Sequence, residues 1–234
     1  MKSDDYQFNT QIEEYYLEEE YDKFDPPSSG TWWGPYFWPV RGHLSASTER
    51  SRSIKDLYST FLTTNIVPQD KKGNGSVWSS FETHLQTNFK ELQHKIYVVS
   101  GVYGTGGGQS NPNIFQEFQA QTNPEEKIAV PDKLWKVVMG FYKGSTSEYP
   151  DYAYGVLVPN NALDVLEIEY NNKGKPRKVT SKKWSDFRYT IKELETILNR
   201  DLEDSGESFE YDFLSNITDP QIKKNLKEKG QSFV

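Results

Sequence analysis

The chain has 234 residues, a net charge of −7, 15% aromatic residues and no cysteine. Its length is enough for one sizeable hydrophobic core, and the absence of cysteine excludes disulfides, thiolate metal sites and cysteine nucleophiles. Because affinity for nucleic acid comes chiefly from lysine and arginine, the acidic balance argues mildly against a general nucleic-acid scaffold. A nuclease is not excluded, since a local basic cleft beside a metal ion can serve an acidic protein.

The start of the chain differs in composition from the rest. Residues 1–30 mix acidic and aromatic side chains, which predicts a solvated, partly helical arm that ends in a break over residues 26–30. The tryptophan-rich residues 32–38 either stack on bases or sugars or, as we favour, pack at the edge of a core. Residues 31–234 are predicted to form a single domain. We expect no signal peptide and no membrane partner, because the first residues are polar and no apolar run could span a bilayer.

The first predicted elements lead to a long helix. We expect a strand to end between Val40 and Ser47, a helix over residues 48–58 and a strand over residues 61–67, which Pro68 closes. Residues 70–73 are predicted to form a loop. Apolar side chains then recur at helical spacing, and they predict that residues 76–95 form the longest helix of the chain. The members of this stripe are Val77, Phe81, Leu85, Phe89 and Leu92.

The later elements are predicted to be strands followed by helices. Residues 95–100, 134–139 and 152–158 have the composition of strands, and the first of these is expected to be buried. The polar, glycine-rich residues 104–125 predict a long loop. Two helices are expected over residues 189–199 and 219–229, the second starting at Asp219-Pro220. His84 and His94 are expected to face solvent.

A histidine, an amide and a carboxylate near the long helix form a candidate metal site. Asn74, Trp78 and Glu82 stand at intervals of four residues, so on an α-helix they share one side. Asn74 and Glu82 would then be about 12 Å apart along the helix axis, too far for both to bind one ion directly. A short amide ligand and a carboxylate acting through water suit magnesium, which dehydrates reluctantly. His43 on a neighbouring strand or turn could take a proton from water near neutral pH.

Each of these residues also has a structural interpretation. His43 alone is more often a hydrogen-bonded turn histidine, and Asn74 alone is a good turn or helix-cap residue. Glu82 alone is typical of a solvated helix face. Arg41 either contacts phosphate or pairs with a carboxylate. The functional interpretation therefore depends on the ordered set of residues.

The ordered set resembles the DNA/RNA non-specific endonucleases of the ββα-metal (His-Me finger) superfamily. That family carries the elements Asp-Arg-Gly-His, Asn-x-x-Pro-Gln and Asn-x-x-x-Trp-x-x-x-Glu. Here they are matched by Arg41-Gly42-His43, by Asn65-Ile66-Val67-Pro68-Gln69, and by Asn74, Trp78 and Glu82. Later segments, including Trp135-Lys136-Val137-Val138 and Val158-Pro159-Asn160, are similar to the family's central strands. The resemblance covers residues 38–230.

The resemblance implies an α+β fold with a central antiparallel sheet flanked by helices. It also implies a magnesium-dependent endonuclease that cuts DNA and RNA in either strandedness, with manganese as an alternative ion. His43 would be the general base, Asn74 the sole protein ligand of the ion, and Glu82 the holder of a metal-bound water. Arg41 would belong to the same catalytic set. An extracellular or periplasmic location is implied by the family alone.

Three departures from the family pattern bear on activity. The family's aspartate before Arg-Gly-His is Val40 here, and an arginine four residues past the glutamate is Gln86. Residues 1–37 contain no arginine, although the family uses an N-terminal arginine to bind phosphate. A second hypothesis is therefore a weakened or inactive relative that binds nucleic acid or glycan without cutting it. A third, which rests on fold analogy, is a toxin-like nuclease neutralised by a protein inhibitor.

Overall fold

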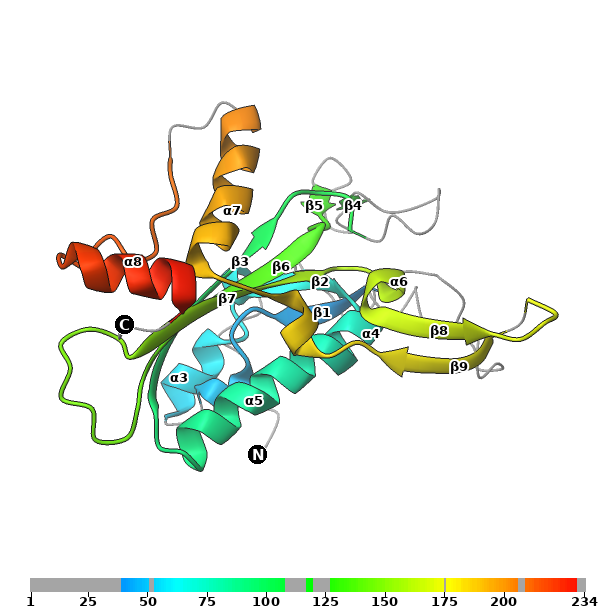
Figure 1. Cartoon of the computed structure of the whole chain (residues 1–234). Coiled ribbons are helices and arrows are strands. Elements are labelled where there is room, and N and C mark those ends of the chain that lie inside the picture. The colour runs from blue at the N-terminus through cyan, green and yellow to red at the C-terminus, as the bar shows by residue number, and fades with distance from the viewer. Residues whose placement is uncertain are drawn as a thin grey trace. The chain divides into compact units, whose positions relative to one another are not determined.

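The computed structural model describes residues 39–50, 53–107, 117–119, 127–174, 176–205 and 209–230 (Figure 1). The predicted arm over residues 1–30 and the tryptophan-rich residues 32–38 lie outside this part of the chain. The described residues form two compact units. The first unit comprises those up to Gly75 together with Thr105–Asp132 and Pro159–Val179. The second comprises Ser76–Gly104, Lys133–Val158 and those from Thr180 onward.

The first unit contains a two-stranded antiparallel ladder. Strand β1 (Pro39–His43) pairs with β2 (Ile66–Asp70), and the register sets His43 opposite Ile66 and Arg41 opposite Pro68. Pro68 was predicted to close the strand, which is wrong because it lies inside β2. A two-stranded ladder leaves each strand one edge without backbone pairing, and a proline without an N–H is tolerated there.

Short helical elements connect the two strands of this ladder. They are a 3₁₀ turn at Ser47–Glu49, helix α3 (Ile54–Ser59) and a second 3₁₀ turn at Thr63–Asn65. Helix α3 begins where the Ser53 side chain accepts a hydrogen bond from the backbone N–H of Asp56. The predicted helix over residues 48–58 is therefore present only in part, and the predicted strand over residues 61–67 begins later.

The remaining elements of the first unit are short. Strands β4 (Glu117–Gln119) and β5 (Lys127–Ala129) pair antiparallel, so the predicted loop over residues 104–125 contains a strand. Helix α6 (Ala162–Val165) follows, and Asn161 caps it by accepting a hydrogen bond from Asp164. A hairpin of β8 (Leu166–Tyr170) and β9 (Pro176–Ser181) comes next in the chain.

Helical structure runs without interruption from Lys71 to Lys90. It consists of α4 (Lys71–Gly73), a π-helical turn (Asn74–Trp78) and α5 (Ser79–Lys90). The predicted loop over residues 70–73 is wrong, because the Asp70 carboxylate accepts hydrogen bonds from the N–H groups of Lys72 and Gly73 and so caps the helix. The predicted apolar stripe holds at Val77, Phe81 and Leu85, which are buried. It fails at Phe89 and Leu92, which are 62% and 50% exposed.

A four-stranded sheet organises the second unit. Its strand order is β10-β7-β6-β3, and β3 (Lys95–Tyr103) pairs antiparallel with β6 (Lys133–Phe141) along its whole length. The other two strands are β7 (Tyr152–Pro159) and β10 (Arg188–Tyr189), which also pair antiparallel. The prediction of a buried strand at residue 95 is wrong. As an edge strand, β3 leaves Tyr97, Val99 and Val102 exposed.

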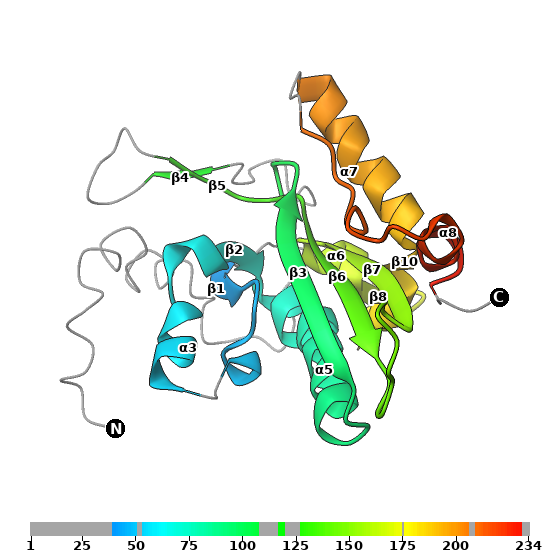
Figure 2. The same ribbon diagram turned by 90° about the vertical axis from the view of Figure 1, so that its left-hand side faces the viewer.

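Helices cover both faces of this sheet (Figure 2). Because side chains alternate along a strand, β6 directs Trp135 and Val137 to one face, where they join a core with Leu194 of α7 (Ile191–Ser205) and Leu226 of α8 (Pro220–Lys229). On the opposite face Phe81 of α5 contacts the ring of Tyr154 from β7. The predicted α+β class, with an antiparallel sheet flanked by helices, is confirmed.

The two C-terminal helices also follow their predicted sequence signals. Asp219 caps α8 by accepting hydrogen bonds from the N–H groups of Gln221 and Ile222, and Pro220 occupies the first helical position, as expected. Gly230 ends the helix with a φ of +73°, a conformation that favours glycine. Of the helices that the structure describes, none has both the length and the apolar composition needed to cross a bilayer.

Candidate functional site

His43 is the last residue of β1, and its side chain is half-buried. The imidazole packs edge-on against the Phe61 ring, with the two ring centroids 5.2 Å apart and the planes at 86°. Its backbone carbonyl accepts a hydrogen bond of 3.4 Å from the Gln69 side chain. The histidine is therefore oriented by an aromatic neighbour and by the adjacent strand.

Gly42 has to be a glycine because the Gln69 side chain lies against it. A Cβ at residue 42 would come within 2.0 Å of the Gln69 Cδ atom. Gln69 is completely buried, so its side chain has little room to move away. The glycine before His43 and the glutamine of the second motif therefore form one packed arrangement.

Asn65 holds the turn that follows His43. Its side-chain oxygen accepts a hydrogen bond from the Ser45 N–H at 2.9 Å, and its amide donates to the carbonyls of Ser45 and Thr60. The backbone N–H of Leu44 adds a bond to the Asn65 carbonyl. The role of Asn65 in this structure is to fix the backbone on which His43 stands.

Asn160 fastens the end of β2 in the first unit. Its side-chain oxygen accepts a hydrogen bond from the Asp70 N–H at 2.8 Å, and its amide donates to the carbonyls of Pro68 and Pro131. Asn160 is 2% exposed, and Asp70 is completely buried. Asp70 is the residue that starts the helix leading to Asn74, so Asn160 holds the backbone at the start of that helix.

Asn74 lies in the π-helical turn and is half-buried. A π turn is rare, is wider than an α turn and is frequent at functional sites. The α-helical spacing that would set Asn74 on the same side as Trp78 and Glu82 therefore does not hold through this turn. Trp78 and Glu82 keep that relation. The predicted metal ligand thus occupies a local irregularity that the sequence pattern did not reveal.

Glu82 is held by a buried lysine of the second unit. The Lys136 ammonium donates a hydrogen bond to Oε1 of Glu82 at 3.2 Å, and the exposed fractions of the two side chains are 0% and 17%. The same ammonium lies 4.7 Å from the centroid of the Trp78 ring. Glu82 is thus not a freely solvated residue of a helix face. Lys136 was not predicted as a site residue, although a lone cation in the apolar run of residues 134–138 was a visible signal.

Arg41 and Val40 occupy less enclosed positions on β1. Arg41 is exposed and stands opposite Pro68, and Val40 stands opposite Gln69. An exposed guanidinium beside His43 in the sequence is suited to contact with an anion. Val40, at the family's aspartate position, offers no carboxylate to orient it.

The other two described histidines are part-buried, which corrects the prediction that they face solvent. His84 stacks on Trp184 with ring centroids 4.5 Å apart. Burial, and then the nearby charge of Arg188, lowers the pKa of His84 below its usual value. His94 lies 3.1 Å from the Tyr152 hydroxyl, and burial is the main cause that raises the pKa of Tyr152 to about 12. His94 thus packs against β7, whereas His84 packs against the 3₁₀ turn at Trp184–Phe187.

The donor set determines which ions the predicted residues could hold. Among the described residues no group of three or more histidine, cysteine, aspartate or glutamate side chains could bind a metal ion. The ligands predicted from the sequence are the Asn74 amide and, through water, the Glu82 carboxylate. These are oxygen donors, and they fit a hard, partly hydrated cation such as magnesium or manganese. His43 and Asn74 belong to the first unit, whereas Glu82 belongs to the second.

Comparison with known proteins gave one family and several relatives. A sequence model of the DNA/RNA non-specific endonucleases matches residues 2–218. A nuclease of the cyanobacterium Nostoc sp. is 27% identical over 196 residues, which make up 81% of this chain and 55% of that protein. The human mitochondrial nuclease EXOG is 29% identical over 123 residues, 53% of this chain and 32% of that protein. This chain therefore spans about half of the first relative and about a third of the second.

The human mitochondrial endonuclease G is 25% identical over 124 residues, 53% of this chain and 39% of that protein. A solved structure, a crystal structure of the EndoG/EndoGI complex, is 17% identical to this chain with a TM-score of 0.43, and the similarity covers 71% of this chain and 58% of that one. Because some of these relatives are mitochondrial proteins, the extracellular or periplasmic location stays a prediction.

Proposed function

This chain belongs to the DNA/RNA non-specific endonuclease family, and we propose that it hydrolyses phosphodiester bonds in DNA and RNA with little sequence or sugar specificity. The observation that carries the proposal is the order of elements in which the candidate residues lie. His43 ends β1, Asn74 follows β2 in the π-helical turn, and Glu82 lies on α5. This order of strand, strand and helix corresponds to the ββα arrangement after which the superfamily that the sequence resembles is named.

In the proposed reaction His43 acts as the general base. Its imidazole takes a proton from a water molecule, the water oxygen attacks the phosphorus, and the bond from phosphorus to the leaving oxygen breaks, after which that oxygen takes a proton from solvent. Asn74 would hold the ion directly and Glu82 would hold it through water. A bound magnesium or manganese ion would neutralise charge on the phosphate and stabilise the leaving oxygen.

Arg41 is proposed to contact a phosphate of the substrate. Its side chain is exposed at the strand position two residues before His43. Contacts to phosphate carry no base information, so an enzyme that relies on them cuts many sequences. Because DNA and RNA share the phosphate group, such a contact supports the proposed activity on both.

The test is cleavage of plasmid DNA and of RNA by the purified chain in magnesium, repeated with a chelator. Substitution His43→Ala is expected to lower the rate about 100-fold or more, and chelation is expected to stop cutting. His94→Gln, a change at a histidine outside the proposed site, should cut within about twofold of the wild type. Cleavage by His43→Ala at the wild-type rate would contradict the assignment.

A second function is favoured by the residue at position 40. Val40 stands where the family has an aspartate, so a weakened or inactive relative that binds nucleic acid or glycan is the alternative. It predicts that fluorescence anisotropy detects binding of a labelled oligonucleotide or glycan while no cleavage accompanies it. Restoring the carboxylate with Val40→Asp should then increase cleavage. A protein inhibitor of this chain also stays a prediction.

A further inference from the structure

Lys136 is a fully buried cation in the middle of an apolar strand. Its side chain is 0% exposed, and its neighbours Trp135 and Val137 in β6 are buried apolar residues. Burying an ammonium group is costly unless it is paired and hydrogen-bonded, and a well-packed apolar residue at such a position is often at least as stable. Stability alone therefore does not explain a lysine at position 136.

Lys136 contacts two residues of the helical segment that carries Glu82. Its ammonium donates to Oε1 of Glu82 at 3.2 Å and lies 4.7 Å from the centroid of the Trp78 ring. Trp78 and Glu82 are one helical turn apart, so the lysine is in contact with successive turns of the same helix face. These three residues all belong to the second unit, and Trp78 and Lys136 are fully buried.

We propose that Lys136 is a positioning residue that holds the Glu82 carboxylate in the orientation needed for a metal-bound water. The inference deepens the proposed function and rests on it. A glutamate side chain has several rotatable bonds, and a hydrogen bond to one oxygen together with packing on one side restricts them. Glu82 remains 17% exposed, so the carboxylate is anchored without being sealed from solvent.

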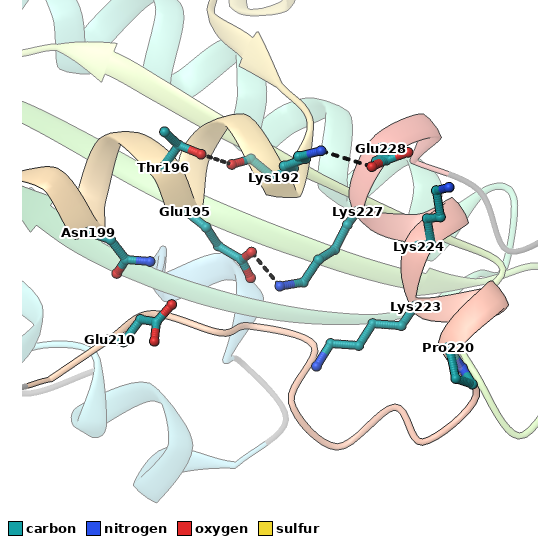
Figure 3. Close-up of a pocket in the computed structure, with 10 residues that line it drawn as sticks. All are labelled: Lys192, Glu195, Thr196, Asn199, Glu210, Pro220, Lys223, Lys224, Lys227 and Glu228. Atoms are coloured by element: carbon teal, nitrogen blue, oxygen red, sulfur yellow. Dashed lines mark hydrogen bonds and ion pairs between the residues drawn. The ribbon is translucent and has the colours of Figure 1, made fainter.

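The experiment compares Lys136→Met with Glu82→Gln and with the double variant. Methionine keeps much of the length of the lysine side chain and removes its charge. The matched control is Lys192→Met, which breaks the ion pair between Lys192 and Glu228 at 2.9 Å, where the side chains are 63% and 37% exposed (Figure 3). Circular dichroism and urea unfolding of each full-length variant establish that it is folded before the other measurements are made.

Two quantities are measured in the folded variants. The first is the dissociation constant of Mn²⁺ without nucleic acid, from electron paramagnetic resonance of the free ion. The second is the pair kcat and KM on plasmid DNA. We expect Lys136→Met to weaken Mn²⁺ binding about tenfold and to lower kcat about tenfold, the size usual for groups that orient metal ligands. KM should stay within about twofold of the wild-type value. The double variant should bind Mn²⁺ no more weakly than Glu82→Gln, and its kcat should be no lower.

Each outcome decides the proposal. It is overturned if Lys136→Met binds Mn²⁺ and cuts within about twofold of the wild type, if the double variant is worse than Glu82→Gln, or if the wild type binds no Mn²⁺. If Lys136→Met does not fold, the double variant, in which both side chains are neutral, is compared with Glu82→Gln. Equal Mn²⁺ affinity and equal kcat support the positioning role, and lower values in the double variant overturn it. A wild type that binds Mn²⁺ in a manner dependent on Lys136 but cuts nothing overturns the endonuclease function and leaves the positioning role standing.

Discussion

Each of the two units is stabilised internally by a different kind of contact. In the first unit, buried polar side chains cross-link the backbone: Gln69 and Asp70 are completely buried, and Asn160 is 2% exposed. In the second unit, an apolar core joins β6 and β7 to α7 and α8. Polar cross-links fix particular backbone atoms and depend on particular partners, whereas an apolar core depends on volume and pattern. The unit that carries His43 is thus the one with the stricter demand on residue identity.

The substitution Asn160→Ala tests the polar cross-links of the first unit and is expected to have the largest effect. The change removes the partner of the Asp70 N–H and of the Pro68 and Pro131 carbonyls. Leaving several buried backbone groups unpaired is expected to lower the free energy of unfolding by roughly 4 kcal/mol. Urea unfolding measures the change. Asn171→Ala, which removes an exposed hydrogen bond to the Lys173 N–H, should cost less than about 1 kcal/mol; equal losses would refute the polar cross-link.

The apolar side of the comparison is tested by Leu194→Ala in α7. Leu194 is completely buried and packs so closely that a Cβ at Gly155 would come within 2.6 Å of its Cδ2 atom. Truncation is expected to cost about 3 kcal/mol, through lost burial and the cavity that it leaves. Leu92→Ala, at a site that is 50% exposed, should cost less than about 0.5 kcal/mol in the same denaturation experiment.

A smaller effect is expected from Gly42→Ala. The new methyl group would have to displace the Gln69 side chain, whose Cδ atom lies within 2.0 Å of the Cβ position. We expect a loss of about 2 kcal/mol from overpacking, and a loss of cleavage because His43 stands on the same strand. Gly75→Ala is the control, since nothing lies within 4 Å of its Cβ position. If both variants melt together with the wild type, the packed arrangement of Gly42 and Gln69 is not a requirement of the fold.

The smallest effect concerns pH and His84 in the second unit. Burial lowers the pKa of His84 below the model-peptide value of 6.5. When the pH falls to 6.5 and below, the unfolded state binds the proton more readily than the folded state. The free energy of unfolding therefore falls as the pH falls from about 7 towards 5. The urea midpoint at pH 7.5 and at pH 5.5 measures this, and His84→Gln should reduce the difference. An unchanged difference would show that His84 makes no contribution to acid sensitivity.

Sequence pattern was most informative where the structure is periodic. Helical spacing identified Val77, Phe81 and Leu85 as buried, and the predicted strands near residues 134 and 152 are present as β6 and β7. The cap at Asp219 and the proline after it marked the start of α8. Each of these signals is local, because capping and amphipathic burial depend on residues that are close together in the chain.

Pattern was less informative where distant segments meet. The long helix was predicted to begin at residue 76, but helical structure begins at Lys71. The buried Asp70 carboxylate that caps it cannot be distinguished from a loop aspartate by its neighbours in the chain. The burial of β3 was overestimated because its place at the sheet edge depends on which strands pair. Lys136 escaped notice for a similar reason, since its partners Glu82 and Trp78 lie more than fifty residues earlier.

The linear order of residues was enough to identify the family, the α+β class and the candidates His43, Asn74 and Glu82, because motif spacing and periodicity are properties of the chain alone. Only the folded structure decided that Gln69 requires Gly42, that Asn160 holds the end of β2, and that a buried lysine holds Glu82. These contacts join segments far apart in sequence. Their strength comes from burial, which removes competing water and makes the loss of a partner costly.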